Sequence, residues 1–115
     1  HPEGDKCIRK IADILNNLLN KKYLFSRYGG DEFIAVMPQT TVEEAYEYAE
    51  MMRKAIIDAR IKHQYSESGG FVTITLGVAS IIPDEDCSVD DFIKKVDNAL
   101  YQAKRKGRNI VAIGS

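Results

Sequence analysis

The stretch YLFSRYGGDEFIAVM, residues 23–37, places two short runs of strand-forming residues on either side of a Gly-Gly-Asp turn. Glycine supplies the positive φ that a tight turn requires, so the stretch predicts a β-hairpin with its tip at Gly29 and Gly30. The run that follows the turn is apolar on both faces, which predicts a central position in a sheet.

The hydrophobic pattern on both sides of the hairpin predicts further helices and strands. Amphipathic helices are expected from Asp5 to about Asn20, from Thr41 to about His63, and from Ser88 to a terminating glycine at Gly107. Alternating side chains predict a long strand over 71–81 and a last strand over 109–113. This order of elements predicts an α+β domain, with the helices packed on a mainly antiparallel sheet.

Two of these helices begin with capping residues. Thr41 and Glu44 form a capping box, in which the hydroxyl and the carboxylate would each accept a hydrogen bond from a free backbone amide. Ser88 stands in the equivalent position before the last helix.

The composition is that of one globular domain. The chain has 115 residues, of which 44% are hydrophobic and 29% charged, and its net charge is -1. This balance argues against a protein that coats nucleic acid or an anionic membrane, so any affinity for anions must be local. Cys7 and Cys87 are too few for a disulfide framework or a zinc site, and we interpret them as reduced thiols in a cytosolic protein.

Two charged clusters could carry chemistry. Asp31 and Glu32 at the hairpin tip offer the hard oxygen ligands that Mg²⁺ prefers, although most such tips are only turns. Lys104 and Arg108 flank the end of the last helix and could bind one polyphosphate. Cations at that position also stabilise the helix dipole, as Asp5 does at the start of the first helix, so spacing alone leaves both readings open.

Four segments resemble one family in the same order along the chain. RYGGDEF at residues 27–33 resembles the signature of the GGDEF family, the bacterial diguanylate cyclases. HPEGDKCI at residues 1–8 is similar to that family's H-x-x-G-D-x-x-L segment, with Ile8 in place of Leu. TITLGVA at residues 73–79 resembles a late strand, and residues 97–109 resemble the closing D-x-A-L-Y-x-A-K-x-x-G-R-N motif.

The resemblance implies a fold similar to the nucleotidyl cyclase and polymerase palm, which is ferredoxin-like. It implies an enzyme that condenses two GTP into cyclic di-GMP with release of pyrophosphate, acts as a homodimer and depends on Mg²⁺ or Mn²⁺. Matched by position, the catalytic and metal-binding carboxylates are Asp31 and Glu32. The matched substrate-binding residues are Asp5 and Ile8 at the guanine, and Gly29, Gly30, Lys104 and Arg108 at the phosphates.

The chain departs from the family's pattern at its beginning. It starts at His1 without a methionine, so we expect it to be part of a longer protein and to lack the family's first strand, which carries a further metal-binding carboxylate. The 115-residue chain alone is therefore expected to be inactive, with an unpaired strand edge that favours self-association. The parent protein is expected to carry an N-terminal sensory domain. The domain itself is expected in the cytoplasm, with a membrane anchor elsewhere in the parent left open.

A second departure concerns product inhibition. The family's inhibitory Arg-x-x-Asp motif falls on Asn20–Tyr23, where neither the arginine nor the aspartate is present. We therefore predict that product inhibition through this segment is lost.

Two other functions remain open at this point. One is a GTP-binding regulatory domain that controls an attached domain, such as a cyclic di-GMP phosphodiesterase. The other is a structural dimerisation module, which would have no use for the matched nucleotide-binding positions.

Overall fold

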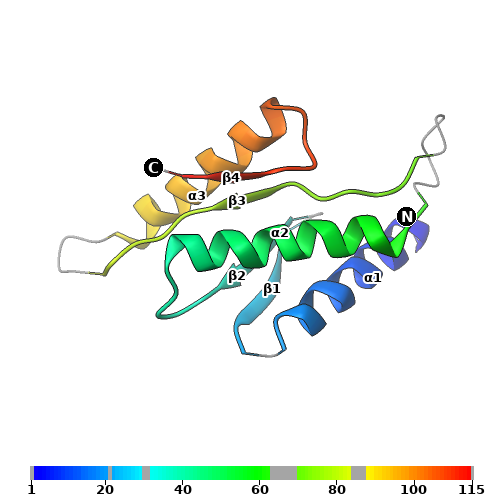
Figure 1. Ribbon diagram of the computed structural model, residues 1–115, viewed down its shortest axis with the longest axis horizontal. Helices are drawn as coiled ribbons and strands as arrows, with labels where there is room; N and C mark the ends of the chain where they lie inside the picture. The colour runs from blue at the N-terminus through cyan, green and yellow to red at the C-terminus, as the bar shows by residue number, and fades with distance from the viewer. Residues whose placement is uncertain (1, 21, 30–31, 63–69, 84–87, 115) are drawn as a thin grey trace.

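The computed structural model describes residues 2–20, 22–29, 32–62, 70–83 and 88–114 (Figure 1). Their helices and strands are, in chain order, α1 (Pro2–Leu18), β1 (Leu24–Gly29), β2 (Glu32–Val36), α2 (Val42–Ala59), β3 (Leu76–Val78), α3 (Val89–Arg105) and β4 (Val111–Ile113). The predicted α+β class is confirmed. In this part of the chain, no helix is both long enough and apolar enough to cross a bilayer.

The strands pair in two separate sheets. β1 and β2 form the predicted antiparallel hairpin, in which Phe25 is opposite Ala35 and Arg27 is opposite Phe33. β3 and β4 are parallel, which the crossover through α3 between them allows. Within the described ranges most of the paired residues are thus antiparallel, as predicted, and β3 with β4 supplies the parallel pairing. There β2 pairs with β1 alone, so the central position predicted for it is not observed.

The long strand predicted over 71–81 is much shorter, because β4 offers only three partner residues to β3. The preceding segment keeps its alternation, and Val72 and Ile74 pack against the core. Its described backbone pairing is limited to a bridge between Lys62 and Phe71, with the Val72 amide donating to the Ile61 carbonyl at 2.7 Å. The alternation of apolar side chains predicted correctly which face of this segment is buried. The number of its residues that form a strand depends on the partner strand.

The main core lies between α1, α2 and β3. Its buried side chains come from these three elements and from the connections that follow α1 and α2, and they are Ile11, Leu15, Leu19, Ala49, Met52, Ile56, Ile61 and Val78. Because Val78 faces this core, the neighbouring Gly77 faces the other side of β3, where the backbone of α3 packs closely. β3 and β4 therefore lie between α2 and α3 (Figure 1).

The helix ends follow the predicted capping residues with two differences. Thr41 accepts from the Glu44 amide at 3.1 Å, but its hydroxyl donates to the Glu44 carboxylate, so that carboxylate bonds to the hydroxyl and not to a backbone amide as expected. α2 ends at Ala59 and not near His63, because Arg60 adopts a left-handed conformation with φ of 50°. Ser88 caps α3 as predicted, accepting from the Asp91 amide at 3.3 Å.

Candidate functional site

The fold brings the acidic hairpin and the basic end of α3 together. Glu32 is the first residue of β2, and its Oε1 lies 3.9 Å from the Nζ of Lys104 in the last turn of α3. These residues are far apart in the sequence, and spacing alone gave no reason to join them. The two side chains remain 45% and 36% exposed, so the ion pair contributes little to stability and either group is available to a ligand.

The metal prediction rests on carboxylates at the hairpin. Asp31 and Gly30 lie outside the described residues, while Gly29 ends β1 next to them. Glu32 fits a magnesium ligand, since it is a hard oxygen donor whose ion pair with Lys104 is long. Across the described ranges there is no cluster of three or more metal-ligating side chains.

The basic end of α3 is a defined backbone motif. The Arg108 amide donates to the Ala103 carbonyl at 3.2 Å, and the Gly107 amide donates to the Lys104 carbonyl at 3.4 Å. These two hydrogen bonds form a Schellman motif around Gly107, whose φ is 115°. The predicted terminating glycine is therefore confirmed. The motif fixes the backbone of Arg108 relative to Lys104, so both cations lie at the same end of the helix.

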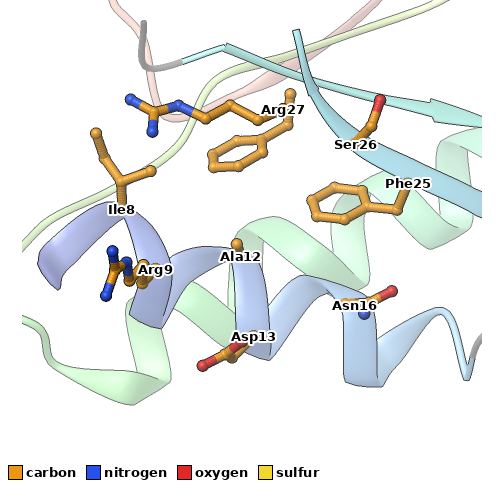
Figure 2. Close-up of a pocket in the computed structure, with 9 residues that line it drawn as sticks. Ile8, Arg9, Ala12, Asp13, Asn16, Phe25, Ser26 and Arg27 are labelled. Atoms are coloured by element: carbon orange, nitrogen blue, oxygen red, sulfur yellow. The ribbon is translucent and has the colours of Figure 1, made fainter. Parts of the chain in front are cut away.

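The two residues matched to guanine binding both lie on α1, and they are placed differently. Ile8 is half-buried and lines a cavity of about 240 Å³ between α1 and the hairpin, whereas Asp5 is exposed and does not line it (Figure 2). The resemblance implied that Asp5 and Ile8 share one pocket. In this cavity only Ile8 of the two is a lining residue.

The cavity wall also contains residues that the sequence reasoning missed. Phe25 and Phe33 stack with their ring centroids 5.4 Å apart and their planes 14° apart, and both line the cavity together with Arg27. The strand register puts these side chains on one face of the hairpin, toward α1. Their alternation along the two strands was the available signal.

The segment matched to the product-inhibition motif has structural contacts of its own. The Lys22 amide donates to the Leu19 carbonyl at 2.9 Å, and the Tyr23 ring packs edge-on against Tyr48 at a centroid distance of 5.4 Å. A side-chain hydrogen bond with Thr40 is the main cause that lowers the pKa of Tyr23. Asn20 has a φ of 53° at the end of α1. The described residues here serve the α1–β1 connection.

We expect cyclic di-GMP to find no specific site at Asn20–Tyr23, because arginine and aspartate contacts to guanine are missing there. The measurement is a calorimetric titration of cyclic di-GMP into the parent protein, with an Asn20→Ala/Lys22→Ala double variant as the comparison. The two titrations should agree within about twofold in affinity, well under the 1.4 kcal/mol that a tenfold change represents. Tight binding that disappears in the double variant would show that the segment does bind product.

The chain is similar to known diguanylate cyclases. The family described as "Diguanylate cyclase, GGDEF domain" matches residues 1–110. The chain is 37% identical over 112 residues to the diguanylate cyclase VdcA of Vibrio cholerae, covering 96% of this chain and 32% of that protein. It thus spans about a third of the length of the first curated relatives it matches.

Solved structures give the same result. The active GGEEF domain of a Vibrio cholerae diguanylate cyclase superimposes with a TM-score of 0.82 at 31% identity, covering 100% of this chain and 70% of that one. The GGDEF domain of DgcB from Caulobacter crescentus, solved with c-di-GMP, gives a TM-score of 0.85 at 28% identity, covering 98% and 66%. The family match over nearly the whole sequence, together with these folds, shows that the chain belongs to the GGDEF family of diguanylate cyclase domains.

Proposed function

We propose that this chain supplies the nucleotide site of a diguanylate cyclase that condenses two GTP into cyclic di-GMP. In each half-reaction a ribose 3′-hydroxyl loses its proton with help from the Asp31 carboxylate, its oxygen bonds to the α-phosphorus of the other GTP, and the bond from that phosphorus to pyrophosphate breaks. The observation that carries the proposal is the 3.9 Å approach of Glu32 to Lys104, which joins the hairpin and the end of α3 into one site. The curated relatives named as diguanylate cyclases, and the c-di-GMP bound to DgcB, support the same reaction.

Each side chain has a role that follows from its charge. Asp31 and Glu32 would hold Mg²⁺ or Mn²⁺, which would supply positive charge to the phosphates. Lys104 and Arg108 would bind the departing pyrophosphate and stabilise the negative charge that develops on it. Gly29 and Gly30 carry no side chain to keep the phosphates from the hairpin backbone. Asp5 and Ile8 would contact the guanine from α1.

The reaction requires two protomers. One such site holds one GTP, whereas the product joins two nucleotides through two new phosphodiester bonds. A homodimer in which two sites face each other presents each 3′-hydroxyl to the opposite α-phosphorus.

The proposed function is tested by incubating the parent protein with GTP and Mg²⁺ and separating the nucleotides by chromatography. We expect cyclic di-GMP and pyrophosphate in a ratio of about one to two, because the metal-assisted condensation of two GTP releases two pyrophosphates for each cyclic di-GMP formed. Binding of GTP without any product would instead identify the regulatory function, in which the domain controls an attached phosphodiesterase or other domain.

The 115-residue chain alone is expected to give no detectable cyclic di-GMP in the same assay, because a metal held by Asp31 and Glu32 needs a further carboxylate to be fixed. The parent protein at the same concentration is the positive control. Product formed by the purified 115-residue chain would show that the hairpin carboxylates are sufficient.

A further inference from the structure

The chain leaves α3 through a turn that needs support. Three consecutive residues have positive φ: Gly107 at 115°, Arg108 at 64° and Asn109 at 51°. Glycine adopts this region freely and asparagine tolerates it, but an arginine pays about 1–2 kcal/mol. Such a conformation persists only where neighbouring groups hold it.

Asn109 is the point at which the rest of the fold holds this turn. Its backbone amide donates to the Thr75 hydroxyl at 2.9 Å, and its side-chain Oδ1 accepts from Nη1 of Arg53 at 3.3 Å. Thr75 precedes β3 and Arg53 lies on α2, so two separate elements fix the residue that follows Arg108.

Arg53 is itself held in place by Glu50. Its Nε donates to one carboxylate oxygen and its Nη2 to the other, both at 3.0 Å. This fork leaves Nη1 directed to Asn109. The side chains of Arg53 and Glu50 are only 18% and 24% exposed. The hydrogen bond from Arg53 is the main cause that lowers the pKa of Glu50 below its ordinary value of 4.5. The Glu50–Arg53 ion pair therefore stabilises the fold at pH values above 4.5, and this contribution is lost as the pH falls through the lowered pKa of Glu50.

We propose that Glu50, Arg53 and Thr75 act through Asn109 as positioning residues for Arg108, holding the left-handed turn that sets Arg108 beside Lys104. The inference rests on the proposed function, since it takes Arg108 as a phosphate ligand. None of these residues need touch the nucleotide. Their effect on GTP binding passes entirely through the backbone position of Arg108.

This route predicts that substitutions at positions 108 and 109 are not additive. In the parent protein, we would measure the affinity of a non-hydrolysable GTP analogue with an α,β-methylene bridge, by calorimetry with Mg²⁺. Asn109→Ala should weaken binding about tenfold in the wild-type background and less than about twofold in the Arg108→Ala background. Asn109→Asp keeps an acceptor for Arg53 and tolerates the left-handed region, so it should bind within about twofold of the wild type.

Matched controls separate positioning from loss of fold. Lys54→Ala removes an exposed cation next to Arg53 on α2 and should leave affinity unchanged. Arg53→Lys keeps the charge but lacks the fork, and it should weaken binding like Asn109→Ala. Melting temperatures measured beside the titrations identify any variant that has unfolded. If Asn109→Ala has unfolded, the affinity measured for Asn109→Asp decides whether the positioning proposal holds.

The outcomes of the cycle are distinct. If Arg108→Ala binds the analogue as tightly as the wild type, the phosphate role of Arg108 fails, and with it that part of the proposed function. If Arg108→Ala weakens binding but Asn109→Ala does not, or weakens it equally in both backgrounds, the positioning proposal fails while the proposed function stands.

Discussion

Replacing Gly77 with alanine should strongly destabilise the domain. A Cβ at this position would lie 2.8 Å from the Leu100 Cα and 2.9 Å from the Val96 carbonyl oxygen, and closer still to the Leu100 amide. All three contacts are backbone atoms of α3, so no side chain can rotate away. β3 and α3 would have to move apart, which we expect to cost about 3 kcal/mol. For a domain of this size, the melting temperature should fall by roughly 10 °C or more.

A second glycine provides the matched control. Gly4 lies in α1, and a Cβ there would meet nothing within 4 Å. Gly4→Ala should therefore raise stability by up to about 1 kcal/mol through helix propensity. Thermal melting followed by circular dichroism compares the two proteins. A Gly77→Ala protein that melts with the wild type would show that β3 and α3 are not in close contact.

Replacing Lys104 with alanine should abolish most of the activity while leaving the fold almost unchanged. Its ion pair with Glu32 is long and half-exposed, so its removal should change stability by less than about 1 kcal/mol. By contrast, loss of a charge that stabilises a departing pyrophosphate should lower kcat/KM for GTP by about 10²–10³-fold. The prediction is this separation of the two effects, measured by melting and by GTP turnover of the parent protein.

Lys94→Ala is the control for the change in net charge. Lys94 is also exposed on α3, about three turns before the helix ends. Its loss should affect neither stability nor turnover by a measurable amount. Equal losses of turnover in Lys94→Ala and Lys104→Ala would mean that α3 contributes only general positive charge, with no phosphate contact at Lys104.

The elements could be predicted from the sequence because local rules determine them. The hairpin register, the cap at Ser88 and the terminating Gly107 depend on residues close in sequence, and the hairpin and α3 formed as expected. The predicted tip of the hairpin includes Gly30 and Asp31, which lie outside the described residues. Strand length could not be predicted in this way. Apolar side chains alternate with threonine or glycine over residues 72–78, yet only Leu76–Val78 find a partner strand among the described residues.

The candidate site could likewise be predicted only in part from the sequence. Residue chemistry identified an acidic hairpin and a basic helix end as separate clusters, and the family resemblance gave their roles. Their proximity, shown by Glu32 and Lys104, depends on tertiary packing that no spacing encodes. The link from Arg53 to Asn109 spans 56 positions and was invisible for the same reason.

The central claim is that the hairpin carboxylates and the end of α3 form one catalytic site for GTP. The most direct test is cyclic di-GMP formation from GTP and Mg²⁺ by the parent protein, measured beside an Asp31→Ala variant of equal thermal stability. Our account predicts steady product formation by the wild type and a loss of at least about 10³-fold in the variant, because a metal-binding carboxylate is removed. Equal rates of product formation in the two proteins would contradict it.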